Sequence, residues 1–281
     1  MDEKRAQKII LNAVVMTRPT WSQYKKWSWK EIDRVFIQHG YEQQGFQNSK
    51  MIPLLKKRGI FSIHSLGAIL LKNENAGKYD RKYAGSQRSK FFKKLRKGEF
   101  GKEGELFADS SDTFLKKKIG NPGRSFWKLL WQILHACAYL RRDYKSSFAK
   151  YIFRKYEAFS NRKNISRSNF LKLTVPEWDN FVKKTKPWRE LKGIGWDTFD
   201  FIFRDIKEVN FAKNAYKFDS ANQHFLKVTG ISQLIIPFNK AKTIEFLKEL
   251  RMNYALAEIK GRDTGSDLII EFMKETKMIT A

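Results

Sequence analysis

Two glycines spaced two positions apart, Gly193 and Gly195, constrain this chain more than any other feature. They lie in residues 191–195 (LKGIG), between two segments whose apolar residues recur at three- and four-residue steps. That spacing is typical of helices that bury one face. A Cβ would obstruct a tight turn between such helices, so the pattern predicts two helices joined by a short hairpin. The apolar positions are Trp178, Phe181, Val182 and Trp188 in the first segment, and Trp196, Phe199, Ile202, Phe203 and Ile206 in the second.

The start of the second predicted helix has the chemistry of a phosphate site. Backbone amides at the start of a helix have no partner within the helix, and the positive end of the helix dipole lies there. Together these groups form a cradle for an anion. A simpler alternative is a helix that ends at a glycine and is followed by another helix.

The segment after the hairpin makes the pattern more specific. In residues 217–230, Phe218 and Asp219 open a short amphipathic helix that closes on Gly230. A hairpin of the form LxGxG, then a helix, a loop and an apolar–Asp pair resembles the HhH-GPD (helix-hairpin-helix) superfamily of DNA glycosylases, the relatives of endonuclease III. The resemblance covers residues 123–230. It implies an all-α fold, with a two-lobed helical glycosylase core, and double-stranded DNA as the partner.

The resemblance also implies roles for particular residues. Asp219 matches the essential carboxylate of the family, and Asp197 lies where members that also cut the strand have Lys. A monofunctional enzyme is therefore expected, one that flips out a base, hydrolyses its N-glycosidic bond and leaves an abasic site. The residues expected at the DNA interface are Leu191, Gly193, Ile194, Gly195 and Asp197.

A carboxylate suits this reaction for a physical reason. Breaking an N-glycosidic bond builds positive charge on the sugar, and a nearby anion stabilises that transition state while water attacks. The nucleotide must first leave the base stack. The plainer interpretation of Asp219 is a helix N-cap. The two are compatible, because helix amides would keep the carboxylate ionised and oriented.

The charge of the chain indicates a polyanionic partner. Lys and Arg total 56 against 29 acidic residues, a net charge of +27 over 281 residues. Nucleic acid is the leading partner, and a membrane surface is the alternative. No apolar run approaches the length of a spanning helix. Residues 9–16 (IILNAVVM) are too short and too close to Asp2 and Glu3 for a signal peptide. We expect a cytoplasmic monomer.

Cofactor chemistry has little support in the sequence. The single cysteine, Cys137, excludes an internal disulfide and the four-Cys iron–sulfur cluster that some relatives carry. Its apolar helical surroundings predict a buried structural thiol. The four histidines are scattered, and Asp197 with Asp200 is the only carboxylate pair suggesting a metal site. No metal or other cofactor is expected, although the resemblance leaves room for a monovalent cation at the hairpin.

Residues 1–122 form a basic N-terminal helical region, and residues 123–281 form the glycosylase-like core, whose C-terminal helices close the bundle. A turn signal, Asn121-Pro122-Gly123, sets the predicted boundary. Helices are expected around residues 6–16, around residues 29–36, and on both sides of Gly59. The last pair could alternatively be a DNA-binding helix-turn-helix.

Residues 73–120 are predicted to be loop-like, because glycines and charges are frequent in them. A basic cluster within this segment alternates with Phe91 and Phe92, which suits phosphate neutralisation and stacking on a displaced base. The alternative is a solvated basic segment anchored by the two rings. The predicted DNA-binding residues of the cluster are Lys90, Lys93, Lys94, Arg96 and Lys97.

Three functions remain open on the sequence. The first is a DNA glycosylase, similar in outline to phage-defence members of the superfamily that remove hypermodified cytosines such as glucosylated hydroxymethylcytosine. The alternatives are a non-catalytic nucleic-acid-binding protein and a metal-dependent nuclease.

Overall fold

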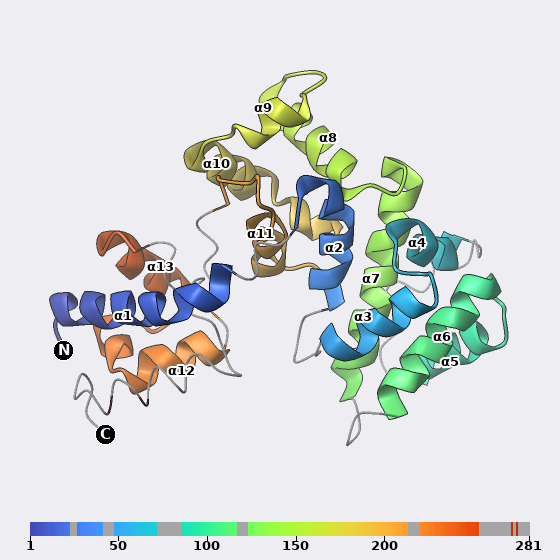
Figure 1. Ribbon diagram of the computed structural model, residues 1–281, viewed down its shortest axis with the longest axis horizontal. Helices are drawn as coiled ribbons and strands as arrows, with labels where there is room; N and C mark the ends of the chain where they lie inside the picture. The colour runs from blue at the N-terminus through green and yellow to red at the C-terminus, as the bar shows by residue number, and fades with distance from the viewer. Residues whose placement is uncertain are drawn as a thin grey trace. The chain divides into compact units, whose positions relative to one another are not determined.

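The chain folds into helices, and the all-α prediction is confirmed for the described residues. A computed structural model describes residues 1–22, 27–41, 48–71, 86–116, 123–212, 218, 220–252, 271 and 274 (Figure 1). Two compact units emerge from the contacts. Unit 1 contains residues 1–26, 173–179 and 204–281, and unit 2 contains residues 27–172 and 180–203.

The helices described between residues 27 and 172 belong to unit 2. After α1 (Glu3–Ser22) of unit 1 come η1 (Trp29–Glu31), α2 (Ile32–Tyr41), α3 (Asn48–Lys57), α4 (Ile63–Leu71), α5 (Ser86–Arg96), α6 (Gly101–Lys116), α7 (Gly123–Tyr144), α8 (Phe148–Ser160) and α9 (Arg167–Leu171). Then follow α10 (Val175–Thr185), η3 (Pro187–Glu190), α11 (Trp196–Arg204), α12 (Ser220–Val228), η4 (Ile231–Leu234) and α13 (Lys240–Glu249).

The central packing in unit 2 is that of α4 against α7. A Cβ on Gly67 would lie 2.6 Å from the carbonyl oxygen of Cys137, so the backbones of the two helices approach each other closely at this glycine. Cys137 is buried, as predicted, and burial raises the pKa of its thiol. None of the described helices has both the length and the apolar character needed to cross a membrane.

This packing divides the chain differently from the sequence prediction. The predicted boundary follows residue 122, yet α4 before it and α7 after it belong to the same unit. Helices α2 to α6, which end before this predicted boundary, and α7, which begins at Gly123, therefore belong to one unit. The physical reason is that the apolar stripe of α7 needs α4 as its partner, and a turn signal carries no information about such long-range pairing.

The expected loop over residues 73–120 contains two helices, α5 and α6, which Figure 1 shows side by side. Phe91 and Phe92 are buried and pack edge-on, 5.5 Å between ring centroids, and the ring of Phe91 contacts that of Phe100 at 5.2 Å. Gly98 and Gly101 have φ of 75° and 72°, which makes the turn between the helices. The loop prediction is wrong here because tertiary packing outweighs the local frequency of glycine and charge.

Several other predicted helices are present with their buried faces. Trp29, Ile32, Val35 and Phe36 are all buried, and α3 and α4 flank a Gly59 whose φ is 70°. Asp33, on the polar side of α2, accepts hydrogen bonds from the amides of Phe148 (2.6 Å) and Ala149 (3.2 Å) at the start of α8. Burial raises the pKa of this carboxyl group.

Unit 1 has its own core, built from α1, α12, η4 and α13. α12 closes at Gly230, whose φ is 77°, as the glycine at the end of that predicted helix implied. Residues 253–270, part of the C-terminal region whose helices are expected to close the bundle, lie outside the described residues. The buried members of this core include Ala6, Ile9, Ile10, Phe225, Leu226, Ile231, Phe246 and Leu247.

Candidate nucleic-acid interface

The two helical segments around the predicted hairpin are α10 and α11, and the link between them is tight. Lys186 takes a left-handed conformation (φ 47°), and Pro187 opens η3. The amide of Leu191 donates to the carbonyl of Trp188, and that of Ile194 to the carbonyl of Leu191, both at 3.0 Å. These bonds fold the chain back before α11 begins. Trp188, predicted on the first helix, belongs to η3 instead.

The two hairpin glycines meet different requirements. Gly193 has φ 79°, and a Cβ there would lie 2.9 Å from the Cβ of Gln132 on α7. Gly195 is exposed, and no atom lies within 4 Å of the place where its Cβ would be. The carbonyl of Gly195 accepts the amide of Phe199 at 2.9 Å, the first turn of α11. The lack of a side chain at Gly193 therefore allows the hairpin to pack closely on α7, while the lack of one at Gly195 leaves the backbone accessible at the start of α11.

Apolar side chains anchor the hairpin in unit 2. Leu191 and Ile194 are buried. A Cβ on Gly40 of α2 would lie 3.6 Å from the Cδ1 of Ile194 and 2.7 Å from the Cδ1 of Ile133 of α7. The hairpin thus rests on the C-terminal end of α2 and on α7, and the apolar residues of LKGIG face inward while the second glycine faces solvent.

The first residue of α11 departs from its predicted place in the core. Phe199, Ile202 and Phe203 are buried as expected, but Trp196 is 38% exposed. Its ring stacks on Trp188, with 5.8 Å between centroids and an interplanar angle of 11°. A stacked tryptophan pair therefore lies beside the open backbone of Gly195, with part of one indole in solvent.

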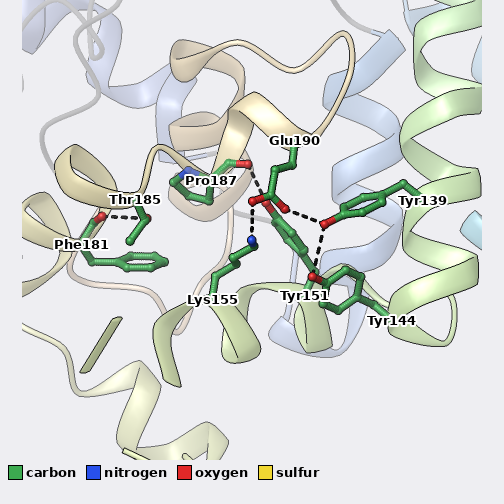
Figure 2. Close-up of polar contacts among 8 residues, drawn as sticks. All are labelled: Tyr139, Tyr144, Tyr151, Lys155, Phe181, Thr185, Pro187 and Glu190. Carbon is green, nitrogen blue, oxygen red and sulfur yellow. Dashed lines mark hydrogen bonds and ion pairs between the residues drawn. The ribbon is translucent and has the colours of Figure 1, made fainter. Parts of the chain in front are cut away.

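Polar bonds from α7 and α8 converge on η3, the link before the hairpin (Figure 2). The hydroxyl of Tyr151 donates to the carbonyl of Pro187 at 2.6 Å. The carboxylate of Glu190 accepts the hydroxyl of Tyr139 at 2.6 Å on Oε2, and it pairs with Lys155 through Oε1. We refer to Tyr139, Tyr151, Lys155 and Glu190 as the clasp.

The electrostatics of the clasp keep its hydroxyls as donors. Burial, and the Glu190 carboxylate that accepts its bond, raise the pKa of Tyr139. Burial and the same carboxylate also raise the pKa of Tyr151. Both phenols therefore remain protonated throughout the range in which the protein is handled. Tyr144 shares a hydrogen bond with Tyr139, at 3.3 Å between the two hydroxyl oxygens, and no bond from it to η3 is found among the described residues.

Cations missed by the sequence prediction surround the hairpin. Lys183, Lys184, Lys186 and Arg189 are exposed, and none forms an ion pair within the part of the chain that the structure describes. Lys192 is half-buried, and its Nζ lies 5.8 Å from the ring centroid of Trp131. Burial lowers the pKa of this lysine. The density of basic residues in KKTKPWRELK was the signal that could have identified them.

The predicted basic cluster on α5 has a different environment. Phe91 and Phe92 are buried, so they anchor the helix and leave no ring for a displaced base. Lys94 pairs with Glu99 at 3.0 Å, and Arg96 pairs with Asp112 on α6. Of the remaining predicted residues, Lys93 and Lys97 are exposed, and the side chain of Lys90 lies outside the described residues.

The predicted catalytic residue, Asp219, lies outside the described residues. α12 begins at the next position, Ser220, and Phe218 on the other side packs 5.5 Å from Phe238, centroid to centroid. On α11, Asp197 is half-buried in the first turn and Asp200 is buried. Over the described ranges, no group of three or more His, Cys, Asp or Glu residues could hold a metal ion.

Comparison with known proteins adds no relative to this description. No family model, no curated protein and no solved structure matches the chain.

Proposed function

We propose that the chain is a DNA N-glycosylase that releases a modified or damaged base and leaves an abasic site. The observation that carries the proposal is the hairpin: Gly195 offers open backbone at the start of α11, on a turn anchored by buried Leu191 and Ile194. Exposed amides at a helix N-terminus bind phosphate. Lys184 and Lys186, exposed beside the turn, supply further phosphate contacts.

Asp219 is the proposed catalytic carboxylate. It directly precedes α12 in the sequence, which is the position where an Asp is favoured as a helix N-cap. Its negative charge stabilises the positive charge that develops on the sugar, and water is the nucleophile. Because Asp197 occupies the position of the strand-cutting lysine, the enzyme has no amine there to form a covalent adduct. The expected product is an intact strand with a missing base.

The assay for this reaction separates three functions. A labelled duplex is incubated with the protein, and half of each sample is then heated in alkali. Breaks that need alkali indicate abasic sites and support the glycosylase. Immediate breaks that require a divalent metal indicate a nuclease. Binding without breaks on any substrate indicates a non-catalytic DNA-binding protein.

The substrate panel follows from the resemblance to phage-defence glycosylases. Duplexes carrying cytosine, hydroxymethylcytosine and glucosylated hydroxymethylcytosine are compared with duplexes carrying oxidised, alkylated and deaminated bases. Mass spectrometry of the released material identifies the base directly. Release of a hypermodified cytosine alone supports the anti-phage role, and release of a common damaged base assigns the enzyme to repair instead.

The DNA surface can be mapped by charge removal. Lys184→Gln with Lys186→Gln removes two cations beside the hairpin, and Lys93→Gln with Lys97→Gln removes two from α5. Log affinity should fall with log salt with a slope of about −0.9 for each phosphate neutralised. We expect the hairpin pair to reduce the slope by about 1 to 2 and the α5 pair to reduce it less. Equal reductions would place both clusters on the DNA.

A further inference from the structure

We propose that the clasp positions the hairpin for phosphate binding, and that Tyr139, Tyr151 and Lys155 are positioning residues. This inference rests on the proposed function, because it concerns the same DNA-binding turn. Three clasp residues, Tyr139, Tyr151 and Lys155, come from α7 and α8, whereas their acceptors, the Pro187 carbonyl and the carboxylate of the fourth, Glu190, lie at the two ends of η3. Figure 2 shows these side chains converging on that link.

The clasp fixes η3, the part of the hairpin that apolar packing does not fix. Leu191 and Ile194 are buried and fix the turn, but they follow η3 in the sequence. The direction in which the chain enters the turn is set by η3 itself, whose first residue follows a left-handed Lys186. A bond at each end of this short helix fixes both its position and its rotation. Backbone amides bind phosphate well only when such supporting groups hold them in place.

Glu190 gives the main reason to assign the clasp to DNA binding. It is the one acid in KKTKPWRELK, a segment otherwise rich in cations. A free carboxylate there would repel a phosphate. In the clasp this carboxylate accepts a hydrogen bond from the Tyr139 hydroxyl and is paired with Lys155, so its charge is compensated. The acid is thus used to fix the turn rather than left to oppose the ligand.

The buried member of the clasp points to the same role. Tyr151 is buried, and its hydroxyl bonds to a backbone carbonyl 36 positions away in the sequence. A partly exposed ion pair such as Lys155 with Glu190 contributes little to stability by its charge alone. A buried hydroxyl on a carbonyl instead restricts geometry, because loss of the hydroxyl leaves that carbonyl without its partner.

The direction in which DNA affinity changes when Glu190 is substituted tests the proposal. Glu190→Ala and Glu190→Gln remove the same negative charge, but Gln keeps an oxygen that can accept the Tyr139 hydroxyl. If Glu190 positions the hairpin, Glu190→Ala should bind an unmodified duplex about tenfold more weakly than wild type, while Glu190→Gln should bind at least as well as wild type. If Glu190 is only a surface acid, both variants should bind more tightly, and that result overturns the inference.

A hydroxyl deletion gives a second test with a matched control. Tyr139→Phe combined with Tyr151→Phe removes both bonds to η3, and Tyr144→Phe removes a neighbouring hydroxyl that does not contact η3. Affinity is measured by fluorescence anisotropy well below the melting temperature of each variant. We expect the double variant to lose about tenfold in affinity and about 1 in salt slope, with Tyr144→Phe unchanged. If the wild type, the double variant and Tyr144→Phe bind DNA with equal affinity, and the double variant differs only in a lower melting temperature, the inference is overturned.

The wild-type measurement separates the two levels of the proposal. Wild-type protein that fails to bind duplex DNA at low salt overturns the proposed function and the positioning role together. Wild-type protein that binds DNA, with clasp variants that bind equally well, overturns the positioning role alone.

Discussion

Gly193 and Gly195 should respond in opposite ways to the same substitution by alanine. At Gly193, an L-residue with φ 79° costs about 1–2 kcal/mol. The added methyl would also lie 2.9 Å from the Cβ of Gln132 and 3.3 Å from the Cδ1 of Ile133. Overpacking of this kind costs about 1–3 kcal/mol. Gly193→Ala should therefore destabilise unit 2 by about 2–5 kcal/mol.

At Gly195 the same methyl meets no atom within 4 Å. Gly195→Ala should leave the free energy of unfolding within about 0.5 kcal/mol of wild type, as for other surface substitutions. Its effect should appear on DNA instead. The methyl projects from open backbone at the start of α11, where a phosphate would approach, so affinity for every duplex sequence should fall alike.

Thermal unfolding and duplex binding, measured on both variants, check the reasoning. For a unit of this size, 1 kcal/mol corresponds to about 2–4 °C, so Gly193→Ala should lower the melting temperature by about 4–20 °C. Gly195→Ala should melt like wild type. A wild-type melting temperature for Gly193→Ala would refute the packing argument. Wild-type DNA affinity for Gly195→Ala would remove the hairpin backbone from the interface.

Three further outcomes are expected. Asp219→Asn should keep the fold and DNA affinity but lose at least about a hundredfold in excision rate, with Asp2→Asn at the start of α1 as control; full activity would place the catalytic carboxylate elsewhere. Burial lowers the pKa of His135 to about 4, so the neutral form contributes stability that is present above pH 6.5 and lost towards pH 4. His135→Gln should reduce the loss of unfolding free energy between pH 7 and 4, measured in urea, by about 3 kcal/mol, and an unchanged pH profile would contradict this. Gly67→Ala should destabilise by about 3 kcal/mol, because its Cβ meets the Cys137 carbonyl, whereas exposed His64→Ala should have little effect; equal melting temperatures would contradict the close approach.

Helical periodicity predicted much of the fold because it is a local property. The buried faces of α2 and α11 follow from apolar residues at three- and four-residue steps, as at Val35, Phe36, Phe199 and Phe203. Trp196 has the same periodicity and yet is exposed. Trp196 is the first residue of α11 and lies beyond the neighbours that bury the rest of the stripe. The spacing of apolar residues does not indicate where along a helix burial stops.

The clasp was beyond the reach of sequence reasoning for a different reason. Tyr139 and Glu190 are 51 positions apart, and Tyr151 and Pro187 are 36 apart. No local pattern marks a tyrosine as the partner of a distant carbonyl, so only the fold brings these groups together. Likewise, Lys94 and Arg96 formed a basic cluster in the sequence, but their acidic partners lie in a segment predicted as loop, Glu99 in the turn between α5 and α6 and Asp112 on α6.

The interleaving of the two units sets the order in which they can be completed during synthesis. All of unit 2 has been made once residue 203 leaves the ribosome, whereas unit 1 combines residues 1–26 and 173–179 with residues 204–281, which contain α12 and α13. The apolar face of α1, with Ala6, Ile9 and Ile10, packs on residues of α12 and α13. The partners of this face in α12, η4 and α13 have therefore not been made while unit 2 is being translated. The nascent chain therefore carries the uncovered apolar face of α1 through most of its elongation, and such a face is a binding site for ribosome-associated chaperones.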